Sequence, residues 1–283
     1  MISLPYFDLI LRARSASGPA ARAFEQFVHW GYWEDPSLAT PDLSEFSRAM
    51  ERLNSELLSA ARIEDGQAVL DCGCGFGGTL AAINESHRDL DMVGVNIDPR
   101  QIRVAEEQWK SKDGNRIRFV EADACDIPLS DGTFDTVLAV ECIFHFPSRF
   151  RFLQEASRVL KPGGRLTLSD FVPWNAGRLS WGSAWVERHV LMGYGTMSTG
   201  WPDGNYRQMA AACELEVSLD RDITPHTLPT YTTLLGLLRR TPGRKRRLRL
   251  TTTLLMWLSR IGLLRYRIVQ LTRRGRPADA APA

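Results

Sequence analysis

Short apolar segments alternate with amphipathic ones through the middle of the chain. Five segments rich in Val, Ile, Leu and Phe have the length and composition of buried strands: 68–72, 92–97, 117–122, 134–140 and 165–171. Apolar residues at spacings of three and four predict helices between them, over 79–87, 99–110 and 148–160. Strands that alternate with helices require crossover connections. The pattern therefore predicts an α/β fold with a doubly wound, mostly parallel sheet.

The flanking segments differ from this core, which we place at 67–171. Residues 1–66 have a helical pattern, and we expect them to form an N-terminal helical lid. Residues 172–203 are rich in Trp and Gly and too long for a plain loop, so we expect a helical cap inserted after the fifth strand. Residues 204–276 should complete the core, and 277–283 should form a disordered tail.

The completing segment contains three kinds of pattern. Helical spacing predicts helices over 205–213 and 248–261, and alternation predicts a strand over 215–223. The composition of 265–274 is that of a strand as well. We expect it to form a last, antiparallel edge strand.

The composition is that of an ordinary globular chain. Of the 283 residues, 44% are hydrophobic and 24% are charged, which excludes disordered and collagen-like chains. The longest apolar run, 251–264, is shorter than the roughly 20 residues of a membrane span. The start lacks a charged leader and a small-residue cleavage site, so we expect a cytoplasmic protein. Five cysteines, an odd number in apolar segments, indicate reduced thiols.

The net charge of +2 hides a strong asymmetry. Residues 223–278 hold 13 Lys or Arg and no Asp or Glu, whereas the remainder holds 22 basic and 33 acidic residues. The helix predicted in this basic segment has an apolar side formed by Leu250, Leu254, Trp257, Leu258 and Ile261. Two interpretations stay open: a solvated helix face, or peripheral contact with an anionic membrane. Nucleic acid is not an expected partner, because aromatic residues do not alternate with the basic cluster.

A glycine-rich turn follows the first strand of the core. Asp71 closes that strand, and Gly73, Gly75 and Gly77 allow the backbone to turn tightly and approach a ligand before a helix begins. Nicotinamide enzymes use a similar turn. A carboxylate directly before the glycines would repel a pyrophosphate but attract a cationic ligand.

The spacing Asp71-x-Gly73-x-Gly75-x-Gly77 resembles the signature of class I S-adenosylmethionine-dependent methyltransferases. Segments 95–98, 121–128 and 158–164 follow in the order that this family uses. The resemblance covers about residues 65 to 171. It implies a Rossmann-like fold, S-adenosylmethionine as the cofactor and S-adenosylhomocysteine as the product.

The resemblance also implies the residues of the cofactor site. After the second strand, Asn96 stands where the family usually has an acid that binds the ribose; an amide can also bond a diol, but without charge assistance. Asp98 is interpreted as the N-cap of the next helix. Asp123 and the backbone of Ala124 would bind the adenine. The expected cofactor-binding residues are Asp71, Gly73, Gly75, Gly77, Asn96, Ile97, Asp123, Ala124 and Val140.

Glu141 and His145 follow the fourth strand and are the candidate catalytic residues. This Glu-x-x-x-His segment is similar to that of sterol and tocopherol C-methyltransferases, as is the His-x-Gly-Tyr-Trp element at 29–33. If the acceptor is a hydroxyl or amine, His145 would remove its proton; if it is carbon, Glu141 would stabilise the developing cation. The chain lacks the Asn/Asp-Pro-Pro-aromatic segment of nucleic-acid amino-methyltransferases, which favours a small molecule.

Aromatic residues gather in the two segments that flank the core, where an apolar acceptor would need walls. We expect the acceptor pocket to be lined by His29, Tyr32, Trp33, Trp174 and Trp185. The acceptor is expected to be a small, mainly apolar metabolite of isoprenoid, polyketide or alkaloid type, methylated at carbon. Alternatives are O- or N-methylation of a natural product, or a protein that binds S-adenosylmethionine without transfer. No metal site is expected, and a homo-oligomer stays open.

Overall fold

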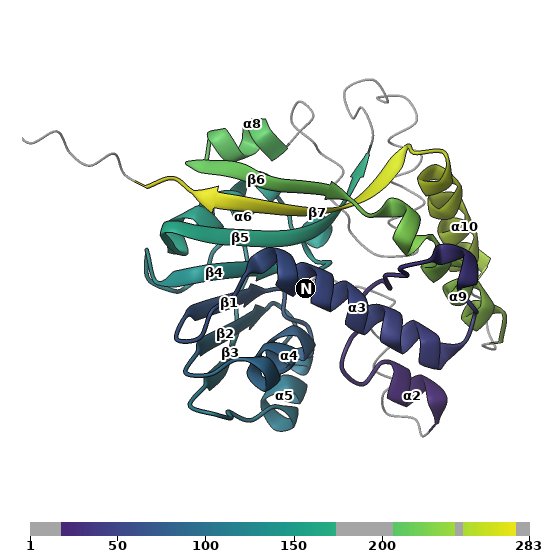
Figure 1. Ribbon diagram of the computed structural model, residues 1–283, viewed down its shortest axis with the longest axis horizontal. Helices are drawn as coiled ribbons and strands as arrows, with labels where there is room; N and C mark the ends of the chain where they lie inside the picture. The colour runs from purple at the N-terminus through teal and green to yellow at the C-terminus, as the bar shows by residue number, and fades with distance from the viewer. Residues whose placement is uncertain (1–17, 174–205, 241–245, 276–283) are drawn as a thin grey trace, which may run out of the picture.

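The chain folds around one seven-stranded sheet in a computed structural model that describes residues 18–173, 206–240 and 246–275. The strand order is β3-β2-β1-β4-β5-β7-β6 (Figure 1). β7 runs antiparallel to both of its neighbours, and the other pairs are parallel. This confirms the doubly wound α/β fold. The strands are β1 (Ala68–Cys72), β2 (Asp91–Asn96), β3 (Arg116–Glu121), β4 (Phe134–Ala139), β5 (Leu160–Pro173), β6 (Leu215–Asp222) and β7 (Leu264–Arg273).

Helices cover both faces of the sheet. Alternate residues of β1 point to opposite sides: Val69 packs with Leu80 of α4, and Leu70 belongs to the cluster that contains Phe152 of α6 and Met209 of α8. The helices are α2 (Pro19–Ala23), η1 (Pro36–Leu38), α3 (Leu43–Ala61), α4 (Gly78–Ser86), α5 (Pro99–Gln108), η2 (Ile143–His145), α6 (Arg149–Val159), α8 (Tyr206–Ala211), α9 (Thr224–Arg240) and α10 (Arg246–Arg260).

The antiparallel strand lies one place inside the edge that the sequence suggests. β7 pairs with β5 on one side and with β6 on the other, so β6 is the edge strand. β7 is buried at Ile268, Val269 and Leu271, as a strand with neighbours on both sides should be. The composition of 265–274 predicted a strand but not its pairing partners.

The N-terminal segment divides into two parts with different roles. Helix α3 packs on the sheet: Leu53 and Leu57 join the cluster of Phe171 and Ile268, so this helix belongs to the core and not to a separate lid. The extended chain at 26–33 leads from α4 to the end of β4, because Gln26 Nε2 donates to the Gly78 carbonyl at 3.3 Å and the Trp30 N–H bonds Glu141 at 2.8 Å.

A buried ion pair ties the second half of the chain to the sheet. The guanidinium of Arg149 donates to both carboxylate oxygens of Asp170, at 2.9 and 3.1 Å, and the hydroxyl of Tyr206 donates to the same carboxylate at 2.7 Å. All three residues are buried. This network fixes α6 and α8 on β5 and gives Asp170 a structural role.

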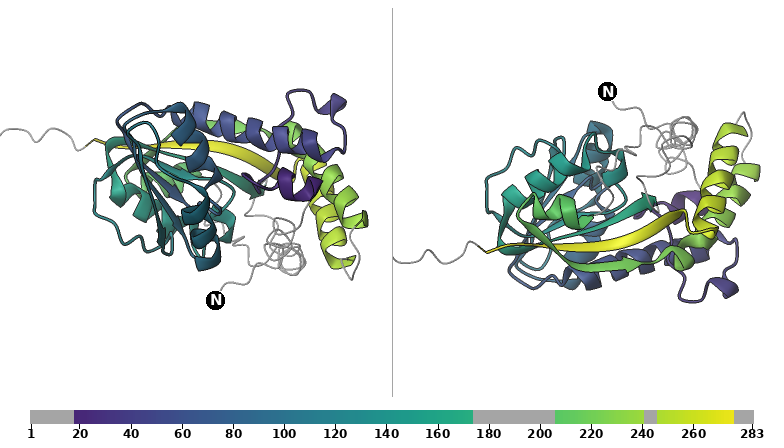
Figure 2. Two further views of the ribbon diagram at one scale, coloured as in Figure 1. Left: turned by 90° about the horizontal axis from the view of Figure 1, so that it is seen from below. Right: turned by 90° about the horizontal axis from the view of Figure 1, so that it is seen from above.

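Helix α9 lies where the sequence analysis predicts no element. It contains Pro225 in its first turn and Pro229 further inside, and prolines usually argue against a helix. α9 and α10 lie side by side at the end of the molecule where β7 begins (Figures 1 and 2). No helix in the described ranges is long and apolar enough to cross a membrane. Most of the expected cap and all of the expected tail lie outside the described residues.

Candidate active site

The candidate site lies where the strand order reverses. β1 and β4 are neighbours in the sheet although two helices and two strands separate them in the chain. In doubly wound sheets, ligands bind at the carboxyl ends of the strands at such a point. The segments expected to bind the cofactor follow the ends of β1, β2, β3 and β4, so the fold brings them to one edge.

The glycine turn after β1 needs glycine at two positions for different reasons. Gly73 has a φ of +73°, and a Cβ there would lie 2.6 Å from the Cβ of Cys142. Gly77 has a φ of +79°, caps α4 and faces the ring of Phe119, only 2.9 Å from where a Cβ would lie. Gly73 N–H donates to the Val95 carbonyl at 2.8 Å. The turn is thus fixed against β2 and the β4 loop.

Asp71 is a buried carboxyl that fits a cationic ligand. Its side chain is 1% exposed, and within the described residues its Oδ1 has no hydrogen-bond partner. Burial raises the pKa of Asp71 to about 8. An unpaired buried carboxyl is costly, and a bound cation would favour its ionised form. This is the chemistry that a ligand with a sulfonium and an ammonium group would supply.

The ribose-binding candidate Asn96 lies at the end of β2. Its Nδ2 donates to Oε1 of Gln101 at 2.9 Å, and Gln101 Oε1 also lies 3.6 Å from the Cβ position of Gly75. Gln101 thus links the amide to the glycine turn, which the sequence did not indicate. The neighbouring Ile97 is 45% exposed, so its side chain is free to contact a ligand. Asp98 caps α5 by accepting from the Arg100 N–H at 3.0 Å, as predicted.

The adenine-binding candidates follow β3. Asp123 accepts from the Cys125 N–H at 2.8 Å, which closes a local turn and holds the carboxylate at the edge of the sheet. Ala124 is buried at 5% exposure. Val140, directly after β4, packs against the cluster that contains Trp30 and Tyr266.

Glu141 is held by two donors on one oxygen. Its Oε1 accepts the Trp30 N–H at 2.8 Å and the hydroxyl of Tyr266. Its backbone has a φ of +51°, and its N–H donates to Ser169 Oγ at 3.0 Å. Burial raises the pKa of Glu141 to about 8, against the opposing effect of the two hydrogen bonds. Glu141 therefore attaches the N-terminal segment to the carboxyl edge of the sheet.

Sequence reasoning missed the residues that surround Glu141. Tyr266 lies opposite Phe171 in the β5–β7 ladder, with their rings 4.5 Å apart, and its hydroxyl oxygen also lies 3.1 Å from Ser169 Oγ. Trp30 packs edge-on against Phe171 and Tyr231, at 5.2 and 4.3 Å between ring centroids. Nothing in the local sequence of β7 marks Tyr266, because its proximity to Glu141 arises from strand order alone.

The two histidines of the candidate site differ in their surroundings. His145 ends η2, and its ring packs edge-on against Phe144 at 4.5 Å. His29 bonds the Trp30 carbonyl through Nδ1 at 2.9 Å, which makes Nδ1 the protonated nitrogen. Its Nε2 is buried and has no partner among the described residues. Burial lowers the pKa of His29 to about 4, so Nε2 is a free hydrogen-bond acceptor at neutral pH.

The other residues expected to line the pocket separate into three groups. Tyr32 is partly exposed and stacks on His226 of α9 at 4.6 Å. Trp33 is only 2% exposed and packs against Phe46 of α3, in a cluster distinct from that of Trp30. The structure therefore assigns Trp33 to the interior. Trp174 and Trp185 lie outside the described residues.

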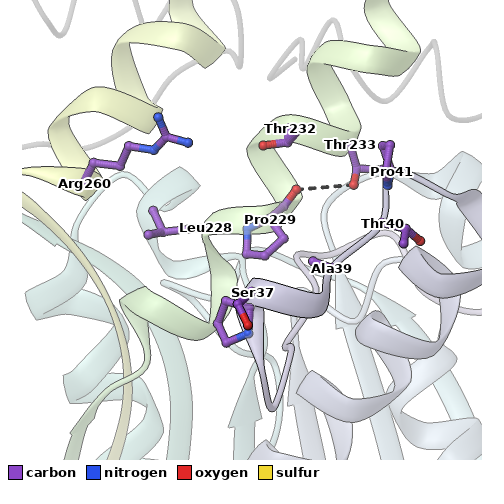
Figure 3. Close-up of a pocket in the computed structure, with 10 residues that line it drawn as sticks. Ser37, Ala39, Thr40, Pro41, Leu228, Pro229, Thr232, Thr233 and Arg260 are labelled. Carbon is purple, nitrogen blue, oxygen red and sulfur yellow. Dashed lines mark hydrogen bonds between the residues drawn. The ribbon is translucent and has the colours of Figure 1, made fainter.

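A surface pocket of about 370 Å³ lies away from these residues. It is formed by the turn around η1 and by α9, with Arg260 of α10 at its rim (Figure 3). None of the predicted cofactor-binding or catalytic residues lines it.

Comparison with known proteins agrees with this geometry. Residues 70–168 match the family model of a methyltransferase domain. The chain is 33% identical over 208 residues to the 27-O-demethylrifamycin SV methyltransferase of Amycolatopsis mediterranei, a match that covers 72% of each protein. The chain belongs to the class I S-adenosylmethionine-dependent methyltransferases. S-adenosylmethionine is its cofactor, and the fit of Asp71 to a cation agrees with this.

Two further similar proteins are named for methyl transfer to different acceptor atoms. An O-methyltransferase of Pyrenophora dematioidea is 38% identical over 147 residues, which cover 52% of this chain and about half, 54%, of that protein. Geranyl diphosphate C-methyltransferase of Streptomyces coelicolor is similar in fold, with a TM-score of 0.69, 18% identity and coverage of 96% of this chain and 99% of that one. The chain is thus a methyltransferase of the natural-product type.

Proposed function

We propose that this chain transfers a methyl group from S-adenosylmethionine to a hydroxyl oxygen of a small, mainly apolar natural product. An isoprenoid, polyketide or alkaloid is the acceptor class. The observation that carries the proposal is the difference between two polar groups of the site. Glu141 Oε1 is occupied by two donors, whereas His29 Nε2 is a buried acceptor without a partner in the part of the chain that the structure describes.

This difference favours oxygen as the acceptor atom. The Glu-x-x-x-His resemblance, by contrast, suggests carbon. A carbon acceptor needs a carboxylate oxygen that faces the developing cation, but Oε1 of Glu141 is already occupied by two donors from the protein. A hydroxyl acceptor needs a neutral base within hydrogen-bond reach, and His29 offers one. The names of the relatives from Amycolatopsis and Pyrenophora, both acting at oxygen, support the same choice.

Each residue of the site would have a separate role in methyl transfer. Asp71, the glycine turn, Asn96, Ile97, Asp123, Ala124 and Val140 would hold the cofactor. The bound cofactor supplies an electrophilic methyl group on a positively charged sulfur. As the oxygen–methyl bond forms and the sulfur–methyl bond breaks, the hydroxyl proton would pass to His29 Nε2. Glu141 would hold His29 in place through the N–H of the next residue, Trp30.

The product tests the choice of atom directly. The protein is incubated with methyl-labelled S-adenosylmethionine and hydroxyl-bearing polyketide, isoprenoid and alkaloid acceptors, and the labelled position is found by mass spectrometry and NMR. We expect the label on oxygen. A label on carbon would overturn the proposal and restore Glu141 as the group that stabilises the cation.

Replacement of the base gives a second test. We expect His29→Asn to lower kcat by about 10²- to 10⁴-fold, because a positioned general base contributes that much. His145→Asn is the matched control and should cost less. Both variants must bind S-adenosylhomocysteine like the parent protein. A larger loss for His145→Asn would make His145 the base.

The pH profile of the parent protein gives a further test of His29 as the base. Because the pKa of His29 is lowered to about 4, kcat/KM should show no acid limb from the base above about pH 5. An ordinary imidazole base would produce a limb near pH 6.5.

A further inference from the structure

Helix α10 buries a mainly polar face and exposes an apolar one. Thr251, Thr252, Leu255 and Ser259 are buried, and Ser259 Oγ bonds the hydroxyl of Tyr231 in α9 at 2.8 Å. On the outer side, Leu250, Trp257 and Ile261 are 59%, 55% and 62% exposed. With Leu254, their spacings of four, three and four residues place them in one stripe. Within the described residues nothing covers this stripe.

Arginines lie on both sides of the apolar stripe. Counted at about 100° per residue from Leu250, Arg246 lies about 40° to one side and Arg247 about 60° to the other. Arg249 and Arg260 lie further round on the Arg246 side, and all four are exposed. The Arg260 guanidinium is 5.9 Å from the Trp257 ring centroid. No acidic residue occurs between 223 and 278 to neutralise them.

Most of the exposed large apolar side chains among the described residues lie in this stripe or on the neighbouring turn around η1. Among the described residues, the large apolar side chains that are exposed are Leu38, Ile97, Leu250, Trp257 and Ile261. Apart from Ile97, these belong to α10, to the residue that directly follows it, Ile261, or to η1, which contacts α9. Figure 3 shows Arg260 on the rim of the pocket between η1 and α9. In Figures 1 and 2 the α9–α10 pair lies at one end of the molecule.

We propose that the α10 face, defined as Leu250, Leu254, Trp257 and Ile261 with Arg246, Arg247 and Arg249, docks on an anionic lipid bilayer. A helix that lies in a membrane interface buries an apolar stripe among the acyl chains and places its cations at the headgroups. Tryptophan prefers that boundary. A second copy of the chain is a poor occupant, because it would bring arginines against arginines. This inference does not depend on the acceptor atom.

Vesicle flotation with the full chain tests the proposal without any acceptor. We expect binding to phosphatidylcholine–phosphatidylglycerol vesicles to be at least about tenfold tighter than to phosphatidylcholine alone. Arg246→Glu with Arg249→Glu should weaken binding at least about tenfold, and so should Trp257→Ser with Ile261→Ser. Arg116→Glu with Arg118→Glu, two exposed arginines on the opposite edge strand β3, is the charge-matched control and should bind like the parent.

Thermal unfolding and binding of S-adenosylhomocysteine establish that each variant is folded. Equal affinity for neutral and anionic vesicles would overturn the proposal. An unchanged affinity of the Arg246→Glu, Arg249→Glu variant would do the same, even if the Trp257 variant failed to fold. Light scattering gives the remaining outcome: a dimer that Trp257→Ser dissociates would assign the α10 face to self-association instead.

Discussion

Glu141 shows how the position of a side chain can be predicted from the sequence while its hydrogen-bond partners cannot. Its position after the fourth strand was sufficient to place it at the carboxyl edge of the sheet. Its partners, Trp30 and Tyr266, come from segments more than 100 residues away on either side. No local pattern could indicate that these donors occupy its oxygen. The sequence therefore predicts the location of Glu141, and the tertiary structure decides its hydrogen bonds.

Two substitutions distinguish the role of Glu141 as a hydrogen-bond acceptor from a role of its charge in catalysis. Because both donors share Oε1, Glu141→Gln keeps an acceptor for each, and we expect kcat to change by less than about threefold, under 1 kcal/mol. Glu141→Ala leaves two buried donors unsatisfied, at about 1–3 kcal/mol each, and should lower both Tm and kcat. A loss of about 10²-fold in kcat for Glu141→Gln would instead indicate electrostatic catalysis at a carbon acceptor.

Among the elements, prediction succeeded where the local pattern and the tertiary surroundings agree. The strands β1 to β5 and the helices α4, α5 and α6 were predicted from periodicity, because each is buried on the faces that its apolar residues define. Helix α9 was missed, since its prolines argue against a helix until packing against α10 and η1 stabilises it. The sequence analysis placed β7 at the edge of the sheet, whereas it lies one position inside it. A strand's own sequence does not specify which strands pair with it.

The contact between α4 and the N-terminal segment can be tested by adding a single methyl group at Gly78. A Cβ at Gly78 would lie 2.0 Å from the Gln26 carbonyl oxygen, so Gly78→Ala should displace the segment at 26–33 and carry His29 away from the site. We expect a marked loss of kcat and faster proteolysis near residue 22. Gly236→Ala in α9 meets nothing within 4 Å and is the matched control. It should leave activity unchanged and raise stability by up to about 1 kcal/mol. Equal effects of the two variants would refute the contact.

At the scale of the whole molecule, the buried carboxyls predict how stability depends on pH. The pKa values of Asp71 and Glu141 are raised to about 8 by burial, so the fold favours their neutral forms. Their stabilising contribution is complete below the unfolded pKa values near 4 and is lost as the pH rises towards 8. Asp98 and Glu155 have lowered pKa values, so they stay ionised over this interval and do not oppose the trend. His29, whose pKa is lowered to about 4, opposes the trend below about pH 6.5, but as one group against two.

We therefore expect the Tm of the cofactor-free protein to fall between about pH 5 and pH 8. Differential scanning fluorimetry measures this directly. Asp71→Asn should reduce the slope, and it should raise Tm most at the upper end of the interval. Asp35→Asn, at an exposed carboxyl with a lowered pKa, is the control and should leave the slope between these pH values unchanged. A Tm that rises with pH would contradict the assignment of Asp71 as a neutral buried acid.

The sequence by itself determined the class of fold, the order of the segments that are expected to bind the cofactor and the basic character of the C-terminal region. These properties depend on local periodicity, on glycines that a tight turn requires and on charge, all of which are read along the chain. Only the tertiary structure decided that Tyr266 meets Glu141, that His29 Nε2 is buried without a partner among the described residues, and that α10 turns its apolar face outward. These depend on which distant segments become neighbours. Strand order and burial settle that question, and neither is encoded in any one stretch of sequence.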